Sequence, residues 1–202
     1  MDNGQLRMDK AMKKRVIVAV TGASGMIYAQ RLLDRLNLPE IREQLSDVAV
    51  VVSEQVKSIW KDEIGEGTPE DFGFKVYSNS DFYVPFASGS SAYDVMVVIP
   101  CSMGTLGRIA TGVSENLIGR AADVMLKERK KLILVTREMP LNLIHINNMK
   151  TVTEAGAVIC PASPAFYHHP QTILDLVDTV VDRILDLSGI EHLAKRWKES
   201  EE

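Results

Sequence analysis

Short runs of continuous apolar residues alternate with longer segments in which apolar and polar residues mix. The runs are RVIVAV, VAVVV, VMVVI, LILV and AVIC, which begin at Arg15, Val48, Val95, Leu132 and Ala157. Apolar runs of this length are typical of parallel strands that are buried on both faces. We therefore predict an α/β fold with one domain, an open parallel sheet sandwiched by helices, either Rossmann-like or flavodoxin-like.

The segments between these runs carry apolar residues at helical spacing. We expect helices at about 26–36, through Trp60, in two stretches that end at Lys127, from Pro140, and after Pro170. Both prolines suit the first turn of a helix, where a missing N–H costs nothing. In the last helix one face is expected to pack on the sheet, with apolar residues Ile173, Leu176, Val177, Val180, Ile184 and Leu187.

Length and composition suit one soluble globular domain. The chain has 202 residues, of which 46% are hydrophobic and 25% charged. The net charge of -4 offers no basic surface for nucleic acid. No apolar run is long enough to span a membrane, and the first residues lack the apolar core of a secretory signal. We expect a cytoplasmic protein with a flexible tail at 1–14 and a single α/β domain at 15–202.

Small polar residues follow the predicted strands. TGASG follows the first strand, Ser53 the second, CSMGT the third, TRE the fourth and ASPAFY the fifth. In a parallel sheet these carboxyl ends open onto one edge, where ligands bind. Glycine and hydroxyl residues that open a helix favour phosphate. TGASG matches neither the dinucleotide fingerprint nor the triphosphate loop, but the hydroxyl groups of Ser24, Ser53, Ser102 and Thr105 together indicate a cofactor that carries phosphate.

Arg137 and Glu138 directly follow a predicted buried strand, so they are expected at the rim of this shared site. A carboxylate in a partly dry cleft can shuttle protons near neutral pH. Glu138 is the better candidate for that role. Glu63 belongs to the sequence KDE at an exposed helix end, where a plain surface acid is the common outcome.

Other polar residues have ordinary explanations. The helical spacing of Arg120, Asp123 and Lys127 favours a salt-bridge stripe on the surface, and Arg183 can lay its stem over the core with its charge in solvent. Tyr167 reads as a loop aromatic, and His168 and His169 have no assigned role. Cys101 and Cys160 show neither metal-ligand spacing nor a disulfide framework.

The motifs TGASG, ASGSS, PCSMGTL, RAADVMLKER, TREMP, IHINNM and PASPAFYHHPQTI, in this order, resemble the flavin prenyltransferases of the UbiX and Pad1 type. The resemblance runs from about Arg15 to Trp197. It implies a metal-independent prenyltransferase that assembles as a homododecamer, with FMN as cofactor and its reduced form as co-substrate. Such enzymes join a dimethylallyl group from dimethylallyl phosphate to N5 and C6 of the flavin, and a UbiD-type decarboxylase receives the prenylated FMN.

The resemblance also implies roles for individual residues. Flavin contacts would come from Gly22, Ala23, Ser24, Ser53, Ser102, Met103, Gly104, Thr105 and Arg137. The phosphate of the prenyl donor would be held by Lys127, Tyr167 and Arg183. Glu138 would relay protons with Glu63 in support, and Ser24 would lie near N5. Phe82 stands where relatives often carry tryptophan beside the prenyl tail, which leaves monophosphate and diphosphate donors open.

Two other functions stay open at this point. A flavin-dependent cysteine decarboxylase of the phosphopantothenoylcysteine type would carry an early histidine and a PASAN loop, where this chain has TGASGMIYAQ and PCSMGTL. A non-catalytic FMN-binding or carrier subunit of a decarboxylase system would not need a second phosphate site. Binding of dimethylallyl phosphate would separate the enzyme from the carrier.

Overall fold

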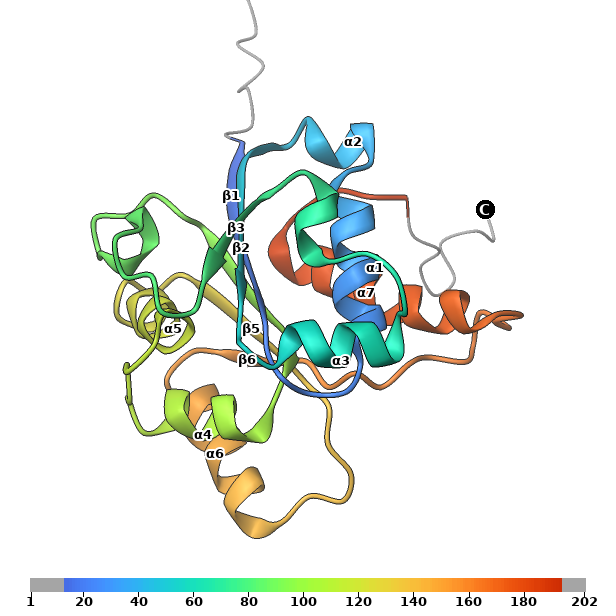
Figure 1. Cartoon of the computed structure of the whole chain (residues 1–202). Helices are drawn as coiled ribbons and strands as arrows, with labels where there is room; N and C mark the ends of the chain where they lie inside the picture. The colour runs from blue at the N-terminus through green and yellow to red at the C-terminus, as the bar shows by residue number, and fades with distance from the viewer. Residues whose placement is uncertain (1–12, 194–202) are drawn as a thin grey trace, which may run out of the picture.

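The computed structural model describes residues 13–193, which form a six-stranded parallel sheet with helices on both faces (Figure 1). The strands are β1 Lys14–Val20, β2 Leu45–Val52, β3 Lys75–Ser78, β4 Val95–Cys101, β5 Lys131–Thr136 and β6 Val158–Ile159. Their order in the sheet is β3-β2-β1-β4-β5-β6, with every neighbouring pair parallel. This is the strand order of the Rossmann fold. The predicted fold class is confirmed, and of the two orders it is the Rossmann one.

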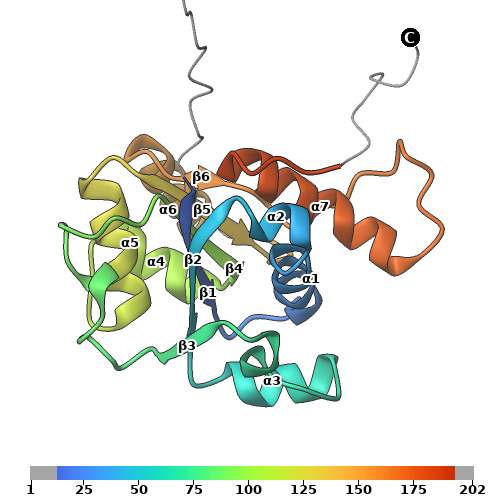
Figure 2. The ribbon, with the colours of Figure 1, turned by 90° about the horizontal axis from the view of Figure 1, so that it is seen from above.

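The helices form a layer on each side of the sheet. They are α1 Met26–Leu36, α2 Pro39–Arg42, α3 Val56–Glu63, α4 Met103–Ala110, α5 Leu117–Lys127, α6 Leu143–Glu154 and α7 Ile173–Ser188, with short 3₁₀ turns η1 Pro69–Phe72 and η2 Pro85–Ala87. Seen from above, α1 and α7 cover one face, and α4, α5 and α6 lie on the other (Figure 2). None of the helices within residues 13–193 has both the length and the apolar character needed to cross a membrane.

The helix layers on both faces of the sheet explain why the strands are continuous apolar runs in the sequence. In β1, Val16, Val18 and Val20 belong to the core beneath α1 and α7, whereas Ile17 and Ala19 belong to the core beneath α4 and α5. All five are at most 1% exposed. Since side chains alternate along a strand, a sheet covered on both faces needs apolar residues at every position. Full burial of a valine or isoleucine contributes about 1.5–3 kcal/mol.

The helix predicted from Pro140 starts later, and the helix predicted after Pro170 does follow that proline, but neither proline lies in a first helical turn. Helix α6 begins at Leu143, because the side chain of Asn142 caps it by accepting the backbone N–H of His145 at 2.9 Å. Helix α7 begins at Ile173, because Thr172 and Asp175 each accept the other's backbone N–H. Side-chain caps satisfy the N–H groups that a helix start leaves free, so they fix the start downstream of Pro140 and Pro170.

The start of α7 also alters its predicted apolar face. Val177, Val180 and Ile184 are buried as expected, but Ile173 is 71% exposed. The first turn of α7 therefore projects beyond the core instead of packing on it.

The pattern missed the edge strand β3. This strand has four residues, all half-buried or exposed, so it lacks the apolar run that marks the central strands. Strand β3 is important for the site, because it brings Ser78, Asn79 and Ser80 to the carboxyl edge of the sheet. Of the predicted tail, residues 1–12 lie outside the described residues, and Lys14 already begins β1. Residues 194–202 of the predicted domain also lie outside them.

Candidate functional site

The loops that follow β1 and β4 are tied together by Thr21. Its buried hydroxyl donates to the carbonyl oxygen of Pro100 at 2.7 Å and accepts the backbone N–H of Ser102 at 2.9 Å. Strands β1 and β4 are neighbours in the sheet, and the chain reverses its direction of winding between them. Ligands of open α/β sheets bind in the crevice at this switch point.

A polar cavity of about 430 Å³ opens at this edge, within the range of about 300–1,000 Å³ usual for cofactor sites. Its walls come from the loops after β1, β2, β3 and β4 and from the start of α5. Of the residues predicted to bind flavin or substrate, those that line it are Gly22, Ser53, Phe82, Ser102 and Thr105. Ala23 and Ser24, in the loop after β1, and Met103 and Gly104, at the start of α4, do not line the cavity.

One wall of the cavity is arranged to receive an anion. Ser102 is the N-cap of α4: its Oγ accepts the backbone N–H of Thr105 at 3.2 Å and contacts Thr105 Oγ1 at 3.0 Å. The first N–H groups of a helix and its dipole favour negative charge. Ser53 Oγ is buried and has no hydrogen-bond partner among the described residues. An unpaired buried hydroxyl is costly, so a phosphate or hydroxyl-bearing ligand fits this wall.

The glycine at position 22 is required by a close approach. A Cβ atom added there would lie 2.8 Å from the Cβ of Gln55, which is closer than real side chains come. The loop after β1 therefore runs against the start of α3. Any larger residue would push the two loops of the cavity apart.

Ser24, Glu63 and Arg137 meet at the start of α1, beside the cavity. Glu63 Oε2 accepts the backbone N–H groups of Gly25 and Met26, both at 2.8 Å, and the hydroxyl of Ser24 also bonds to this carboxylate. Arg137 Nε donates to the carbonyl oxygen of Ser24 at 3.0 Å. The fold therefore brings together three residues that the sequence places on separate elements.

The environment of Glu63 favours its charged form. Partial burial raises the pKa of this carboxyl, but the hydrogen bonds from Ser24, Gly25 and Met26 and the charge of Arg137 outweigh burial, so the pKa lies below its ordinary value. By accepting the backbone N–H groups of Gly25 and Met26, Glu63 caps the start of α1. Glu138, by contrast, is exposed, and its Oε1 accepts the N–H of the next residue, Met139, at 3.1 Å.

Tyr167 and Arg183 line a different cavity. It measures about 960 Å³ and lies against α7, where Arg35 and Asp182 also contribute to its walls. Arg183 Nη1 is 3.9 Å from Asp186 Oδ2, and its side chain is 64% exposed. The ion pair between Arg35 Nη2 and Asp182 Oδ1, at 2.6 Å, joins α1 to α7 along this wall.

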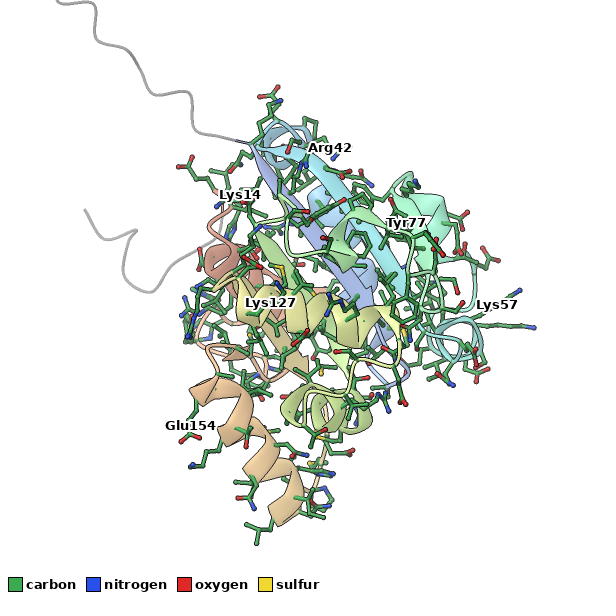
Figure 3. All side chains as sticks on the ribbon, turned by 90° about the vertical axis from the view of Figure 1, so that its left-hand side faces the viewer. Lys14, Arg42, Lys57, Tyr77, Lys127 and Glu154 are labelled. Atoms are coloured by element: carbon green, nitrogen blue, oxygen red, sulfur yellow. The ribbon has the colours of Figure 1, made fainter. Side chains whose placement is uncertain are left out.

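Lys127 lies in a third place, at the end of α5 (Figure 3). Helix α5 starts at the flavin-sized cavity, where Ile118 lines the wall, and Lys127 follows roughly 13 Å farther along the helix axis at 1.5 Å per residue. Its Nζ is 2.5 Å from Glu128 Oε1. Arg120 pairs with Asp123 at 3.1 Å, as the spacing predicted. A single chain thus does not gather Lys127, Tyr167 and Arg183 around one site.

Comparisons with known proteins agree on what kind of protein has this site. The model of the flavoprotein family matches residues 6–185. A flavin prenyltransferase UbiX from Methanocaldococcus jannaschii is 45% identical over 186 residues, which cover 91% of this chain and 98% of the relative. The chain belongs to the UbiX flavin prenyltransferase family. The UbiX protein of Pseudomonas aeruginosa is also 45% identical, over 92% of this chain and 95% of its own.

Solved structures of UbiX proteins share the fold closely. AnUbiX (PadA1), described in complex with FMN and dimethylallyl pyrophosphate, has a TM-score of 0.83 and 39% identity, covering 92% of this chain and 100% of that one. A dodecameric FMN-dependent UbiX-like decarboxylase from Escherichia coli O157:H7 has a TM-score of 0.83 and 40% identity, covering 91% and 99%. The peptidyl-cysteine decarboxylase EpiD, at 16% identity and a TM-score of 0.60, shares the fold alone.

The structure adds cavity residues that the sequence reasoning missed. The loop after β3 supplies Asn79, whose carbonyl and side-chain oxygens accept the N–H groups of Leu117 at 2.8 Å and Ile118 at 2.9 Å. Arg108 lines the same cavity, one turn after Thr105. The polar run after KVYS would have pointed to Asn79. The spacing of three residues from Thr105 would have placed Arg108 on the same face of the helix.

Neither cysteine lines the polar cavity. Burial raises the pKa of Cys101 to about 12 and also raises the pKa of Cys160, so both stay thiols. In the part of the chain that the structure describes, no three His, Cys, Asp or Glu side chains are grouped as a metal site would require.

Proposed function

We propose that this chain is a flavin prenyltransferase, which joins a dimethylallyl group from dimethylallyl phosphate to N5 and C6 of reduced FMN. One observation carries the proposal: a cavity with an anion-binding wall lies beside the cluster of Ser24, Glu63 and Arg137. The first feature suits the phosphate of a nucleotide-like cofactor. The second would set fixed charges and hydrogen-bond donors beside a reacting group, and the membership of this chain in the UbiX family supports that role.

The residues of the cavity fit FMN. Ser102, Thr105 and the buried, unpartnered hydroxyl of Ser53 would hold its phosphate, while Gly22 lets the backbone approach closely. Arg137, fixed through the carbonyl of Ser24, would orient the ring. When bound in its reduced form, the flavin supplies the nucleophilic atoms N5 and C6.

The transfer has a simple balance of bonds. The bond between C1 of the donor and its phosphate oxygen breaks, and phosphate leaves with the electron pair. C1 forms a bond to N5, from which a proton departs. Ring closure joins C3 of the donor to C6, with one proton added at C2 of the donor and one removed from C6. Fixed cations lower the barrier to phosphate departure, and the aromatic ring of Phe82 in the cavity wall can shelter the developing allylic cation.

Proton movement falls to Glu138 in this proposal. Its exposed carboxylate follows Arg137 directly, so it can exchange protons with solvent. In this proposal it would also take up a proton on behalf of the departing phosphate. Ser24 would act near N5, held in place by its bond to Glu63. The ionised Glu63 would support the site by fixing Ser24 and the start of α1.

Completion of the donor site requires more than one copy of the chain. Lys127, Tyr167 and Arg183 lie away from the cavity within one chain, so their proposed grip on the donor phosphate needs neighbouring subunits. Large apolar side chains exposed on two segments favour such contacts: Met139 87%, Leu143 70%, Ile144 68%, Phe166 69% and Ile173 71%. We propose a homododecamer, the state named for the related E. coli protein.

The remaining parts of the proposal rest on the family resemblance. A UbiD-type decarboxylase would receive the prenylated FMN, and both proteins would work in the cytoplasm. Co-purification of prenylated FMN with a co-expressed decarboxylase, and its absence without this chain, would test that transfer.

A binding experiment separates the enzyme from a mere FMN carrier. Dimethylallyl phosphate should bind the FMN-loaded protein in calorimetry, and R183A and K127A should each weaken that binding by about 10-fold while FMN affinity stays unchanged. Dimethylallyl diphosphate is titrated in parallel, because AnUbiX is described with the pyrophosphate. Failure of both donors to bind would favour the carrier.

A further inference from the structure

Arg108 lies in the second half of α4, but its guanidinium folds back toward the first turn of that helix. Nη2 donates to Thr105 Oγ1 at 3.3 Å, and a Cβ atom added at Gly104 would lie 3.7 Å from Nη1. The residue is half-buried and lines the flavin cavity. The guanidinium thus sits against the anion-binding wall formed by Ser102 and Thr105.

No carboxylate within residues 13–193 forms an ion pair with Arg108, whereas Arg31, Arg35 and Arg120 each have an aspartate partner. A cation held near the amino-terminal end of a helix opposes the helix dipole. The contact with the Thr105 hydroxyl does not offset that charge. The arrangement becomes favourable when an anion enters the cavity between the guanidinium and the helix start.

The groups around Arg108 indicate which anion. Ser53 Oγ, buried and without a partner, lines the same cavity as Arg108, Ser102 and Thr105. Hydroxyl donors and the first turn of a helix are the usual partners of phosphate oxygens. The planar guanidinium fork matches phosphate better than a lysine would.

We propose that Arg108 binds the phosphate of FMN and thereby makes this protein select FMN over riboflavin. This inference rests on the proposed function, since it assumes that the cavity holds FMN. With riboflavin in the cavity, the guanidinium would gain no counter-charge, so only FMN would profit from its presence. Arg108 is therefore a specificity residue of the cofactor site and has no part in the transfer of the prenyl group.

The test measures dissociation constants for FMN and riboflavin by quenching of flavin fluorescence, with the full chain and its variants. R108A should weaken FMN binding by on the order of 10- to 100-fold and change riboflavin binding by less than about 3-fold, as expected for loss of a charge-assisted hydrogen bond. R108K should recover part of the FMN affinity, because it keeps the charge but not the fork. R108Q keeps the length of the side chain without its charge and should resemble R108A. K57A removes the same charge from α3, where Lys57 points away from the molecule (Figure 3), and should change neither constant.

A wild-type measurement covers the case in which the variants fold poorly: inorganic phosphate should compete with FMN but not with riboflavin. Equal losses of FMN and riboflavin binding in R108A and R108Q, or no loss in either, overturn the role of Arg108 and leave the proposed function intact. Failure of the wild-type protein to bind FMN at all overturns the proposed function itself, and the role of Arg108 with it.

Discussion

Glu63 Oε2 accepts the backbone N–H of Met26 at 2.8 Å, although the two residues belong to different helices. The last residue of α3 therefore caps the start of α1. Gly25, the residue at the N-cap position of α1, has no side chain to do so and adopts a left-handed conformation with φ of 111°. Since Ser24 and Arg137 are held at the same point, this cap sets the position of the proposed reacting groups.

The cap predicts how stability depends on pH. Because the folded-state pKa of Glu63 lies below its ordinary value, the carboxylate stabilises the fold fully above the unfolded value of about 4.3, and this contribution is lost as pH falls through the folded pKa. E63Q should lower the free energy of unfolding at pH 7 by about 1 kcal/mol or less, since the group is largely exposed to screening solvent. The difference between the two proteins in urea titrations should shrink as pH falls below the unfolded value of about 4.3.

The matched control for this prediction is D62N, which changes the exposed neighbouring acid on α3. It should leave stability at pH 7 unchanged. An E63Q effect of equal size at pH 7 and pH 3 would show that the charged cap is not what stabilises the fold.

The buried hydroxyl of Ser53 predicts opposite effects on stability and on flavin binding. S53A removes an unpaired polar atom, so the melting temperature of the flavin-free protein should stay the same or rise. FMN affinity should fall by about 5- to 30-fold, corresponding to one lost hydrogen bond of roughly 1–2 kcal/mol. S58A, which removes an exposed hydroxyl on α3, serves as control. A lower melting temperature with unchanged FMN affinity would assign Ser53 to the fold instead of the site.

The contact between Gly89 and Lys127 provides a test of the proposed donor site. A Cβ atom at residue 89 would clash with Lys127 Nζ and with Glu128 Oε1, so G89A should displace the ends of these two flexible, ion-paired side chains without straining the backbone. We expect the KM for dimethylallyl phosphate to rise about 5- to 10-fold, while FMN affinity stays within about 2-fold. K127A gives the reference for complete loss. An unchanged KM in both variants would remove Lys127 from the donor site.

The proposed proton relay at Glu138 predicts that E138Q slows the chemical step. E138Q keeps the shape of the side chain but cannot relay protons, so kcat should fall by about 10²- to 10⁴-fold with FMN affinity unchanged. E154Q alters an exposed glutamate at the end of α6 (Figure 3) and should retain full turnover. Wild-type turnover in E138Q would end the proton-relay assignment.

The central fold was predictable because its strands are buried on both faces. β1, β4 and β5 carry apolar residues at nearly every position, and each is followed by small polar residues that lie together at the sheet edge. The rule that carboxyl ends share an edge therefore placed Ser53, Ser102 and Thr105 in one cavity. β3 escaped the same rule, since an edge strand with exposed residues has no such pattern.

The other site contacts could not be predicted from the sequence, because they depend on how side chains from different elements lie in three dimensions. The pairing of Glu63 with the start of α1 depends on how two helices pack, which no spacing within either helix reveals. Arg183 reads as an ordinary surface arginine on its helix, and in one chain it lies at a cavity away from the flavin-sized one. Its proposed role comes from the family resemblance and needs an assembly that one sequence does not describe.

The most direct test of the central claim is the mass of the flavin after reaction. The wild-type protein is mixed with reduced FMN and dimethylallyl phosphate without oxygen, and the flavin is then extracted and weighed by mass spectrometry. We predict a gain that corresponds to one dimethylallyl unit in place of one hydrogen, dependent on the protein. Unmodified FMN despite tight binding, with the diphosphate donor tested as well, would contradict prenyl transfer and leave a flavin carrier.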